Sequence, residues 1–132
     1  MAKTTRPRAQ RAPARAPRLP NQITAAIEAA QSRKATDVIV LDLRQTAAFT
    51  DYFLICTGSN ARQVQAIADA VEDALKTKKI RPTHVEGHQR AEWILLDYFD
   101  FVDHVFSTNA RQFYGLERLW GEATRIELDD NE

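Results

Sequence analysis

The stretch TDYFLICTGSNARQVQAIAD, residues 50–69, predicts a strand, a glycine turn and a helix in direct succession. Residues 52–57 form a short apolar run rich in aromatic and β-branched side chains, which is typical of a strand buried on both faces. Gly58 permits a sharp reversal, and Ser59 or Asn60 can cap the following helix, with Gln63 placed for a capping box. A strand that runs straight into an amphipathic helix is half of a βαβ unit, so this stretch predicts an α/β fold.

The residues before this stretch predict one more helix and one more strand. A narrow apolar stripe indicates a helix over residues 21–33, and the β-rich run DVIVLDL indicates a strand over residues 37–43. The connection from this strand to residues 52–57 is too short for a helical crossover. We therefore expect these two strands to be antiparallel neighbours.

The residues after this stretch complete the predicted sheet. Strands are expected at 83–86, where the βαβ crossover should end, and at 91–97 and 101–107. One continuous helix is expected over residues 109–120, with Phe113, Leu116 and Trp120 on one side. The sequence thus predicts a compact mixed β-sheet of about five strands with flanking helices.

Composition divides the chain of 132 residues into three parts. We expect a disordered basic tail rich in proline and arginine at 1–20, one α/β domain at 21–121, and a frayed acidic tail at 122–132. Residues 1–18 hold six basic residues and no acidic ones, whereas the rest of the chain holds 12 basic and 18 acidic residues. The predicted domain is therefore acidic, which argues against DNA binding through a broad basic face.

The residue types that build enzyme sites are sparse in this sequence. The turn GSNAR, residues 58–62, puts a glycine and a hydroxyl at a helix N-terminus, where phosphate can bind, but no closely spaced pair of acids follows it to hold a metal. A nucleotide-binding or nucleotide-transferring enzyme that uses Gly58 and Ser59 stays open as the alternative function. We expect no cofactor and no metal site, and His104 is interpreted as a packed histidine bonded to a neighbour. The only cysteine, Cys56, excludes a disulfide framework.

A binding surface is the function class that the run WILLDY, residues 93–98, favours. Alternation puts Trp93, Leu95 and Asp97 on one strand face, and Ile94, Leu96 and Tyr98 on the other. Large apolar groups on both faces leave two interpretations open. Helices cover both faces, or one face forms an aromatic and leucine patch edged by acids, as in an interface with a polar rim.

Several segments, in one order and at fitting spacings, resemble the ribosomal silencing factor family, also called the Iojap-like family. They are DVIVLD (37–42), TDYFLICTGSNARQVQAIAD (50–69), EGHQRAEWILLDYFD (86–100), HVF (104–106) and RQFYGLERLW (111–120). Two positions depart from the family pattern. Phe99 stands where a small turn residue is usual, and Asp103 stands where an apolar residue is usual, which affects the expected last hairpin.

The resemblance implies a nucleotidyltransferase-like α/β fold without catalytic acids, and a function that is not enzymatic. It implies a factor that binds the large ribosomal subunit at its protein fourteen, blocks subunit association and represses translation when nutrients are limiting. The residues implied at this contact are Trp93, Leu95, Asp97, Tyr98 and Asp100. The N-terminal tail is expected to add at most weak contact with ribosomal RNA, and a homodimer of the free protein stays open. No signal peptide is visible, and we expect a bacterial cytoplasmic location over an organellar one.

Overall fold

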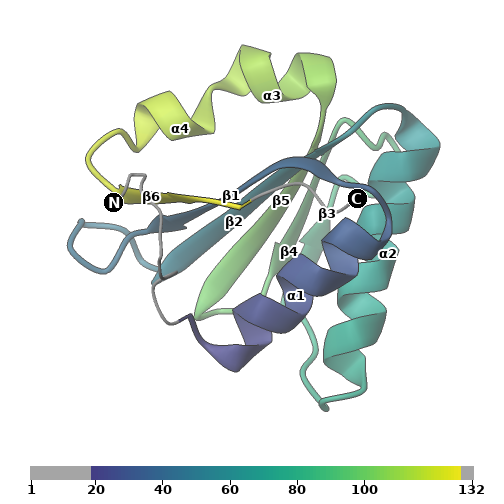
Figure 1. Ribbon diagram of the computed structural model, residues 1–132, viewed down its shortest axis with the longest axis horizontal. Helices are drawn as coiled ribbons and strands as arrows, with labels where there is room; N and C mark the ends of the chain where they lie inside the picture. Colours follow the sequence, from purple (N-terminus) through teal and green to yellow (C-terminus); the bar gives the residue numbers. More distant parts are fainter. Residues whose placement is uncertain (1–18, 129–132) are drawn as a thin grey trace.

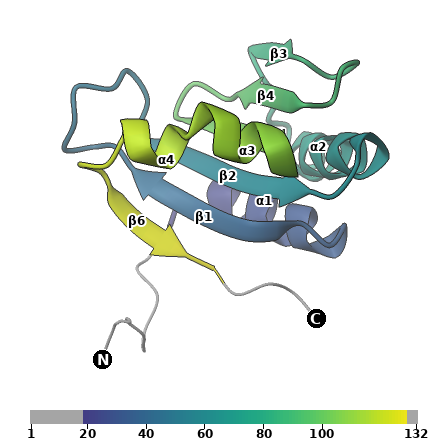
Figure 2. The ribbon, with the colours of Figure 1, turned by 90° about the horizontal axis from the view of Figure 1, so that it is seen from above.

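The computed structural model describes residues 19–128 and shows a six-stranded mixed sheet between two helical layers (Figure 1). The strands are β1 (Thr36–Asp42), β2 (Tyr52–Gly58), β3 (His84–Glu86), β4 (Trp93–Asp97), β5 (Phe101–Ser107) and β6 (Thr124–Glu127), in the order β3-β4-β5-β2-β1-β6. The helices are α1 (Asn21–Ser32), α2 (Ala61–Lys76), α3 (Thr108–Tyr114) and α4 (Leu116–Leu119). Helices α1 and α2 cover one face of the sheet, and α3 and α4 cover part of the other (Figure 2). The predicted α/β class is confirmed.

Strand β2 lies in the interior of the sheet and is buried along its whole length, as its apolar sequence predicts. It pairs antiparallel with β1, so the expected neighbour relation of these strands is confirmed, and it pairs parallel with β5. Helix α2 then carries the chain to β3, which runs parallel to β2. The crossover is longer than a simple βαβ unit, because β5 and β4 lie between its two strands.

The turn between β2 and α2 is held by the capping residues that the sequence indicates. The Asn60 side chain accepts a hydrogen bond from the Gln63 backbone N–H at 2.8 Å, and Gln63 Oε1 accepts from the hydroxyl of Ser59 at 2.8 Å. A Cβ at Gly58 would lie 2.9 Å from Val64 Cγ2, so glycine is needed here for close approach of the helix to the strand. The Gln63 amide also donates to the Arg33 carbonyl at 3.0 Å, which ties α2 to the end of α1.

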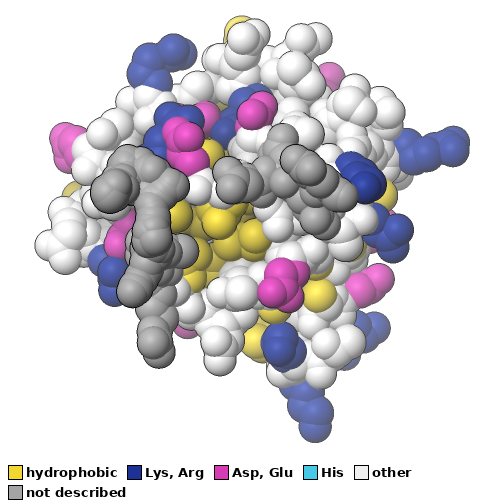
Figure 3. Space-filling model, in the orientation of Figure 1, with side chains coloured by type: hydrophobic (Ala, Val, Ile, Leu, Met, Phe, Trp, Pro, Cys, Tyr) yellow, Lys and Arg dark blue, Asp and Glu magenta, His cyan; other side chains and the backbone are white. Residues whose placement is uncertain are grey.

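The sheet separates two apolar clusters. The helix-side cluster lies between the sheet and the helices α1 and α2, and includes Ile23, Leu54, Val64 and Ile94. The opposite cluster lies under α3 and α4, and includes Phe53, Ile55, Phe106 and Leu116. Figure 3 shows hydrophobic side chains in the middle of the face that carries β6 in Figure 1, with charges of both signs around them.

Two expectations for the C-terminal part of the chain are wrong. The helix predicted over 109–120 is broken at Gly115, which adopts a left-handed conformation with φ 56° and separates α3 from α4. Glycine adopts this conformation at little energetic cost. Gly115 therefore ends α3 and does not lie inside a longer helix. The segment from residue 122, which was expected to be a frayed tail, contains strand β6. The sheet therefore has six strands, where about five were expected.

Strand β6 forms because the outer edge of β1 offers unpaired backbone groups. Val40 pairs with Ile126 and Ile39 with Glu127 in an antiparallel register. Ile126 also packs against the helix-side cluster, which adds apolar burial to the backbone hydrogen bonds. The predictions for residues 1–18 and 129–132 lie outside the described residues.

The side chain of Asp103 is an acid buried completely in the apolar interior. It lies on β5 directly between Leu54 of β2 and Leu96 of β4, on the side of the sheet that α2 covers. Neither carboxyl oxygen has a hydrogen-bond partner among the described residues. Burial raises the pKa of Asp103 to about 8, because the charged form loses its hydration. Asp103 is therefore a neutral carboxyl in the core near pH 7.

We predict that Asp103 makes the folded protein less stable as pH rises. The carboxyl ionises near pH 4 when the chain is unfolded but near pH 8 when it is folded, so the unfolded state releases a proton first. Between these values the unfolding constant should rise about tenfold per pH unit from this group alone. In urea titrations from pH 5 to 8, Asp103→Asn should remove that slope, whereas Asp73→Asn, an exposed acid on α2, should keep it. Equal slopes in the wild type and Asp103→Asn would contradict the prediction.

Candidate interaction surface

Strand β4 shows the alternation that its sequence predicts. Ile94 and Leu96 are buried on the side of α2, whereas Trp93 and Leu95 are half-buried on the opposite side. On that side α3 packs over β5 and β2 but leaves the β3–β4 end of the sheet uncovered (Figure 2). Of the two interpretations left open by the sequence, the structure therefore favours one covered face and one patch that is accessible in part.

Trp93 is held by a hydrogen bond and by three neighbouring rings. Its Nε1–H donates to His104 Nδ1 at 3.0 Å, across the β4–β5 pair. The Trp93 ring lies 5.0 Å from the ring of Phe106 and 4.7 Å from that of Tyr114, measured between centroids. His104 is buried, so its interpretation as a packed histidine bonded to a neighbour is confirmed.

Acidic side chains border this apolar patch. Glu86 of β3 is the register partner of Leu95, and directly opposite residues of an antiparallel pair point to the same side of a sheet. Glu92 precedes Trp93, is exposed, and lies 3.5 Å from the guanidinium of Arg90. Asp97 lies further along the same strand face, and its carboxylate accepts a hydrogen bond from the Phe99 backbone N–H at 2.8 Å. The patch is thus apolar at its centre, and its rim carries three acids and one basic residue, Arg90.

Helix α3 adds two aromatic side chains that the sequence pattern did not assign to this surface. Phe113 is 78% exposed and Tyr114 43% exposed, at the point where Gly115 ends the helix. Two hollows meet at Tyr114 and Glu92, one bounded by Phe113 and the other by Trp93. The expectation that Phe113 shares one side of a closing helix with Leu116 and Trp120 is wrong, because α3 ends at Tyr114, and Leu116 is buried whereas Phe113 is exposed. The signal in the sequence was Gly115 itself, directly after the two aromatic residues.

We call this surface the Trp93 face. It consists of Glu86, Glu92, Trp93, Leu95, Asp97, Phe113 and Tyr114. Three of the five residues implied by the resemblance, namely Trp93, Leu95 and Asp97, lie on it together.

Tyr98 and Asp100 lie elsewhere. Tyr98 is buried in the helix-side cluster, where its ring stacks on that of Phe101 at 4.9 Å, and burial raises the pKa of its hydroxyl. Asp100 is exposed in the β4–β5 hairpin, next to Phe99, which has φ 74° and is 74% exposed. The Phe99 carbonyl accepts a hydrogen bond from the Thr50 hydroxyl at 2.8 Å, which helps to hold this strained turn. The β4–β5 hairpin thus forms with Phe99 at its turn.

The GSNAR turn uses its polar groups to cap α2. Both the Ser59 hydroxyl and the Asn60 side chain are bonded to Gln63. Asp42, at the end of β1, forms an ion pair with Arg44 at 2.9 Å, and the hydrogen bond from Arg44 lowers the pKa of Asp42. Within residues 19–128, no group of three or more histidine, cysteine or acidic side chains is arranged to hold a metal ion. The geometry of this turn is that of a helix cap.

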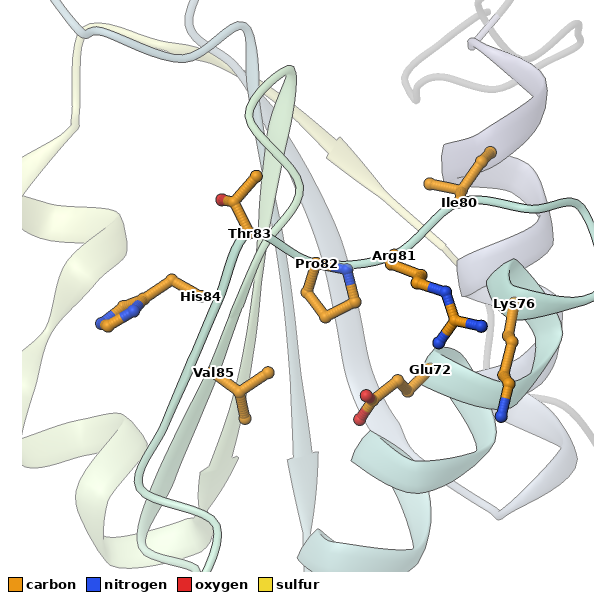
Figure 4. Close-up of a pocket in the computed structure, with 8 residues that line it drawn as sticks. All are labelled: Glu72, Lys76, Ile80, Arg81, Pro82, Thr83, His84 and Val85. Atoms are coloured by element: carbon orange, nitrogen blue, oxygen red, sulfur yellow. The ribbon is translucent and has the colours of Figure 1, made fainter.

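A separate pocket lies between α2 and β3, on the helix side of the sheet (Figure 4). Its lining mixes apolar side chains such as Ile80 and Val85 with charged ones, including Glu72, Lys76 and Arg81. It contains none of the five residues implied by the resemblance. Among the described helices, none is both long and apolar enough to cross a bilayer.

Comparisons with known proteins agree with the motifs. The family model described as "Ribosomal silencing factor during starvation" matches residues 16–132. Proteins named ribosomal silencing factor from Halalkalibacterium halodurans and Bacillus subtilis are 38% and 40% identical over 104 residues, which span 79% of this chain and 89% and 88% of theirs. A solved structure from Chromobacterium violaceum has a TM-score of 0.74 at 36% identity, and the match covers 76% of this chain and 84% of that one.

The names of these relatives describe a regulatory factor and not an enzyme. The match runs through the sheet, the helices and the Trp93 face, so it is not confined to one motif. The resemblance drawn from the sequence is confirmed, and the chain belongs to the ribosomal silencing factor family.

Proposed function

We propose that this protein binds the large ribosomal subunit at its protein fourteen through the Trp93 face, and that it thereby blocks association with the small subunit. Translation would then be repressed when nutrients are limiting. The observation that carries this proposal is a partly buried tryptophan on a paired strand, with aromatic and leucine neighbours and acids at the rim, in a chain of this family.

The chemistry of the Trp93 face fits a protein partner. Tryptophan and tyrosine are the residue types that most often carry binding energy at interfaces, particularly where less important polar contacts surround them. Trp93 and Tyr114 are in ring contact, so a partner that covers one also meets the other. The acids Glu86, Glu92 and Asp97 give the rim a negative charge, which favours a basic ribosomal protein and raises its association rate.

The proposed mechanism is steric occlusion, which needs a stable surface and no turnover. The sheet supplies this stability, because β4 is paired on both sides and backed by α2. The Cys56 thiol is fully buried, and burial raises its pKa, so it is a poor nucleophile. The alternative, an enzyme using Gly58 and Ser59, loses support because the Ser59 hydroxyl is bonded to Gln63 within the helix cap.

The similar bacterial proteins support a bacterial cytoplasmic location. A homodimer of the free protein, in which two Trp93 faces meet, would compete with ribosome binding. Its formation would appear as a dependence of affinity on protein concentration.

Trp93→Ala should weaken binding to isolated large subunits about thirtyfold, because a hot-spot contact is worth about 2 kcal/mol or more. Co-sedimentation at several protein concentrations measures this loss, and circular dichroism checks that the variant is folded. Leu119→Ala is the matched control, since Leu119 is an exposed apolar side chain of α4 outside the Trp93 face. If folded Trp93→Ala sediments with large subunits as well as the wild type, the assigned face is wrong.

The basic residues of segment 1–18 are proposed to add a weak, salt-sensitive attraction to ribosomal RNA. Deleting residues 2–18 should flatten the dependence of binding on salt concentration, because fewer counterions are released from phosphate. Inhibition of subunit joining at low salt should remain. Loss of all inhibition in the truncated protein would show instead that the tail is the primary contact.

A further inference from the structure

The bond between Trp93 and His104 defines the state of the histidine. An indole N–H can only donate, so His104 Nδ1 must be the acceptor in the 3.0 Å contact and must carry no proton. The neutral ring then has its proton on Nε2. Burial lowers the pKa of His104 to about 3, which keeps this neutral form at every pH near 7.

The surroundings of His104 are apolar. It lies on β5 opposite Leu95, and the centroids of the His104 and Phe53 rings are 4.5 Å apart in a T-shaped arrangement. Its Nε2 atom is buried and has no hydrogen-bond partner among the described residues. A buried donor without a partner is destabilising, so packing alone favours an apolar side chain here, as at Val102 and Phe106 on the same strand face.

His104 does, however, accept a directional hydrogen bond from Trp93, the side chain at the centre of the Trp93 face. Trp93 is only half-buried, and an indole at such a position can adopt other rotamers. The acceptor on β5 selects the rotamer in which the ring also meets Phe106 and Tyr114. Ordering this side chain before binding removes an entropy cost that would otherwise reduce affinity.

We propose that His104 is a positioning residue, which fixes the Trp93 indole in its binding orientation by accepting its N–H. The proposal rests on the proposed function, because the orientation matters only if Trp93 contacts the partner. His104 itself is 3% exposed, so it acts through Trp93 and does not touch the partner.

Two substitutions separate the acceptor from the packing. His104→Leu keeps an apolar side chain in the cluster but removes the acceptor. His104→Asn removes the ring but puts a side-chain oxygen where Nδ1 stands, one bond beyond Cγ. Binding to large subunits should weaken about three- to tenfold in His104→Leu, as expected for one side chain that must be ordered on binding, and His104→Asn should recover most of that loss.

A second readout follows the indole directly. Hydrogen exchange of the Trp93 Nε1–H, measured by NMR, should be at least about tenfold faster in His104→Leu than in the wild type or His104→Asn. The indole of Trp120, the C-cap residue of α4, serves as the internal reference, because its ring packs against Phe53 and is not the partner of His104 in the hydrogen bond. Unchanged Trp93 exchange in His104→Leu, or wild-type affinity despite fast exchange, would overturn the proposal.

If His104→Leu does not fold, the bond can be removed from the Trp93 side. Replacing Trp93 with 3-benzothienylalanine keeps the shape of the ring and lacks the N–H, and it should lower affinity to the same extent. Unchanged affinity in that variant would overturn the proposal. The two hypotheses also remain separable. Trp93→Ala with full binding refutes the proposed function alone, whereas lost binding in Trp93→Ala beside unchanged binding in folded His104→Leu refutes only the positioning role.

Discussion

The parallel pairing of β2 with β5 is the interaction on which the rest of this structure depends. It runs from Tyr52 opposite Phe101 to Gly58 opposite Ser107, and β2 is buried on both faces along this length. Just after the end of β2, Asn60 caps the start of α2, which covers the helix side of the sheet. From the end of β5, the Ser107 cap starts α3, which covers the opposite side. One helix in each helical layer, α2 on one side and α3 on the other, is therefore placed by the ends of this strand pair.

The same arrangement explains why one part of the sheet remains accessible. Helix α3 follows β5 directly and packs back over β5 and β2, and it reaches β4 through the Tyr114 side chain at its C-terminal end. Arg111 of α3 strengthens this position, because its guanidinium donates to the Thr57 hydroxyl and the Asp37 carbonyl, each at 2.8 Å. Trp93 and Leu95 are consequently backed by the sheet and open to a partner. In the proposed function, a surface of this kind acts by the space it occupies.

The sequence predicts the elements whose signals are local. The strand and capped helix at 52–76 follow from hydrophobic runs and from Asn60 and Gln63, and the alternation along residues 93–98 correctly separates Trp93 from Tyr98. The resemblance groups these two residues in one contact, and the structure places them on opposite sides of the sheet. A residue set taken from a family motif carries no information on which face each member occupies.

The features that the sequence does not predict depend on distant partners. Strand β6 is four residues long and gains its stability from the open edge of β1, about 80 residues earlier in the chain. The break at Gly115 is the exception, because its signal is local: the glycine adopts a left-handed conformation and ends α3 directly after Phe113 and Tyr114. The bond between Trp93 and His104 requires the β4–β5 register, which neither strand reveals alone.

The measurement that tests occlusion most directly is a titration of the protein against a fixed amount of large subunits, followed by addition of small subunits. Joined particles are read by light scattering. If the protein acts by filling a site, inhibition should follow occupancy, with half of the effect when about half of the large subunits are filled under tight binding. Excess free protein fourteen should then restore joining by competition. Full inhibition at far below one protein per large subunit would mean turnover, and it would contradict the occlusion mechanism.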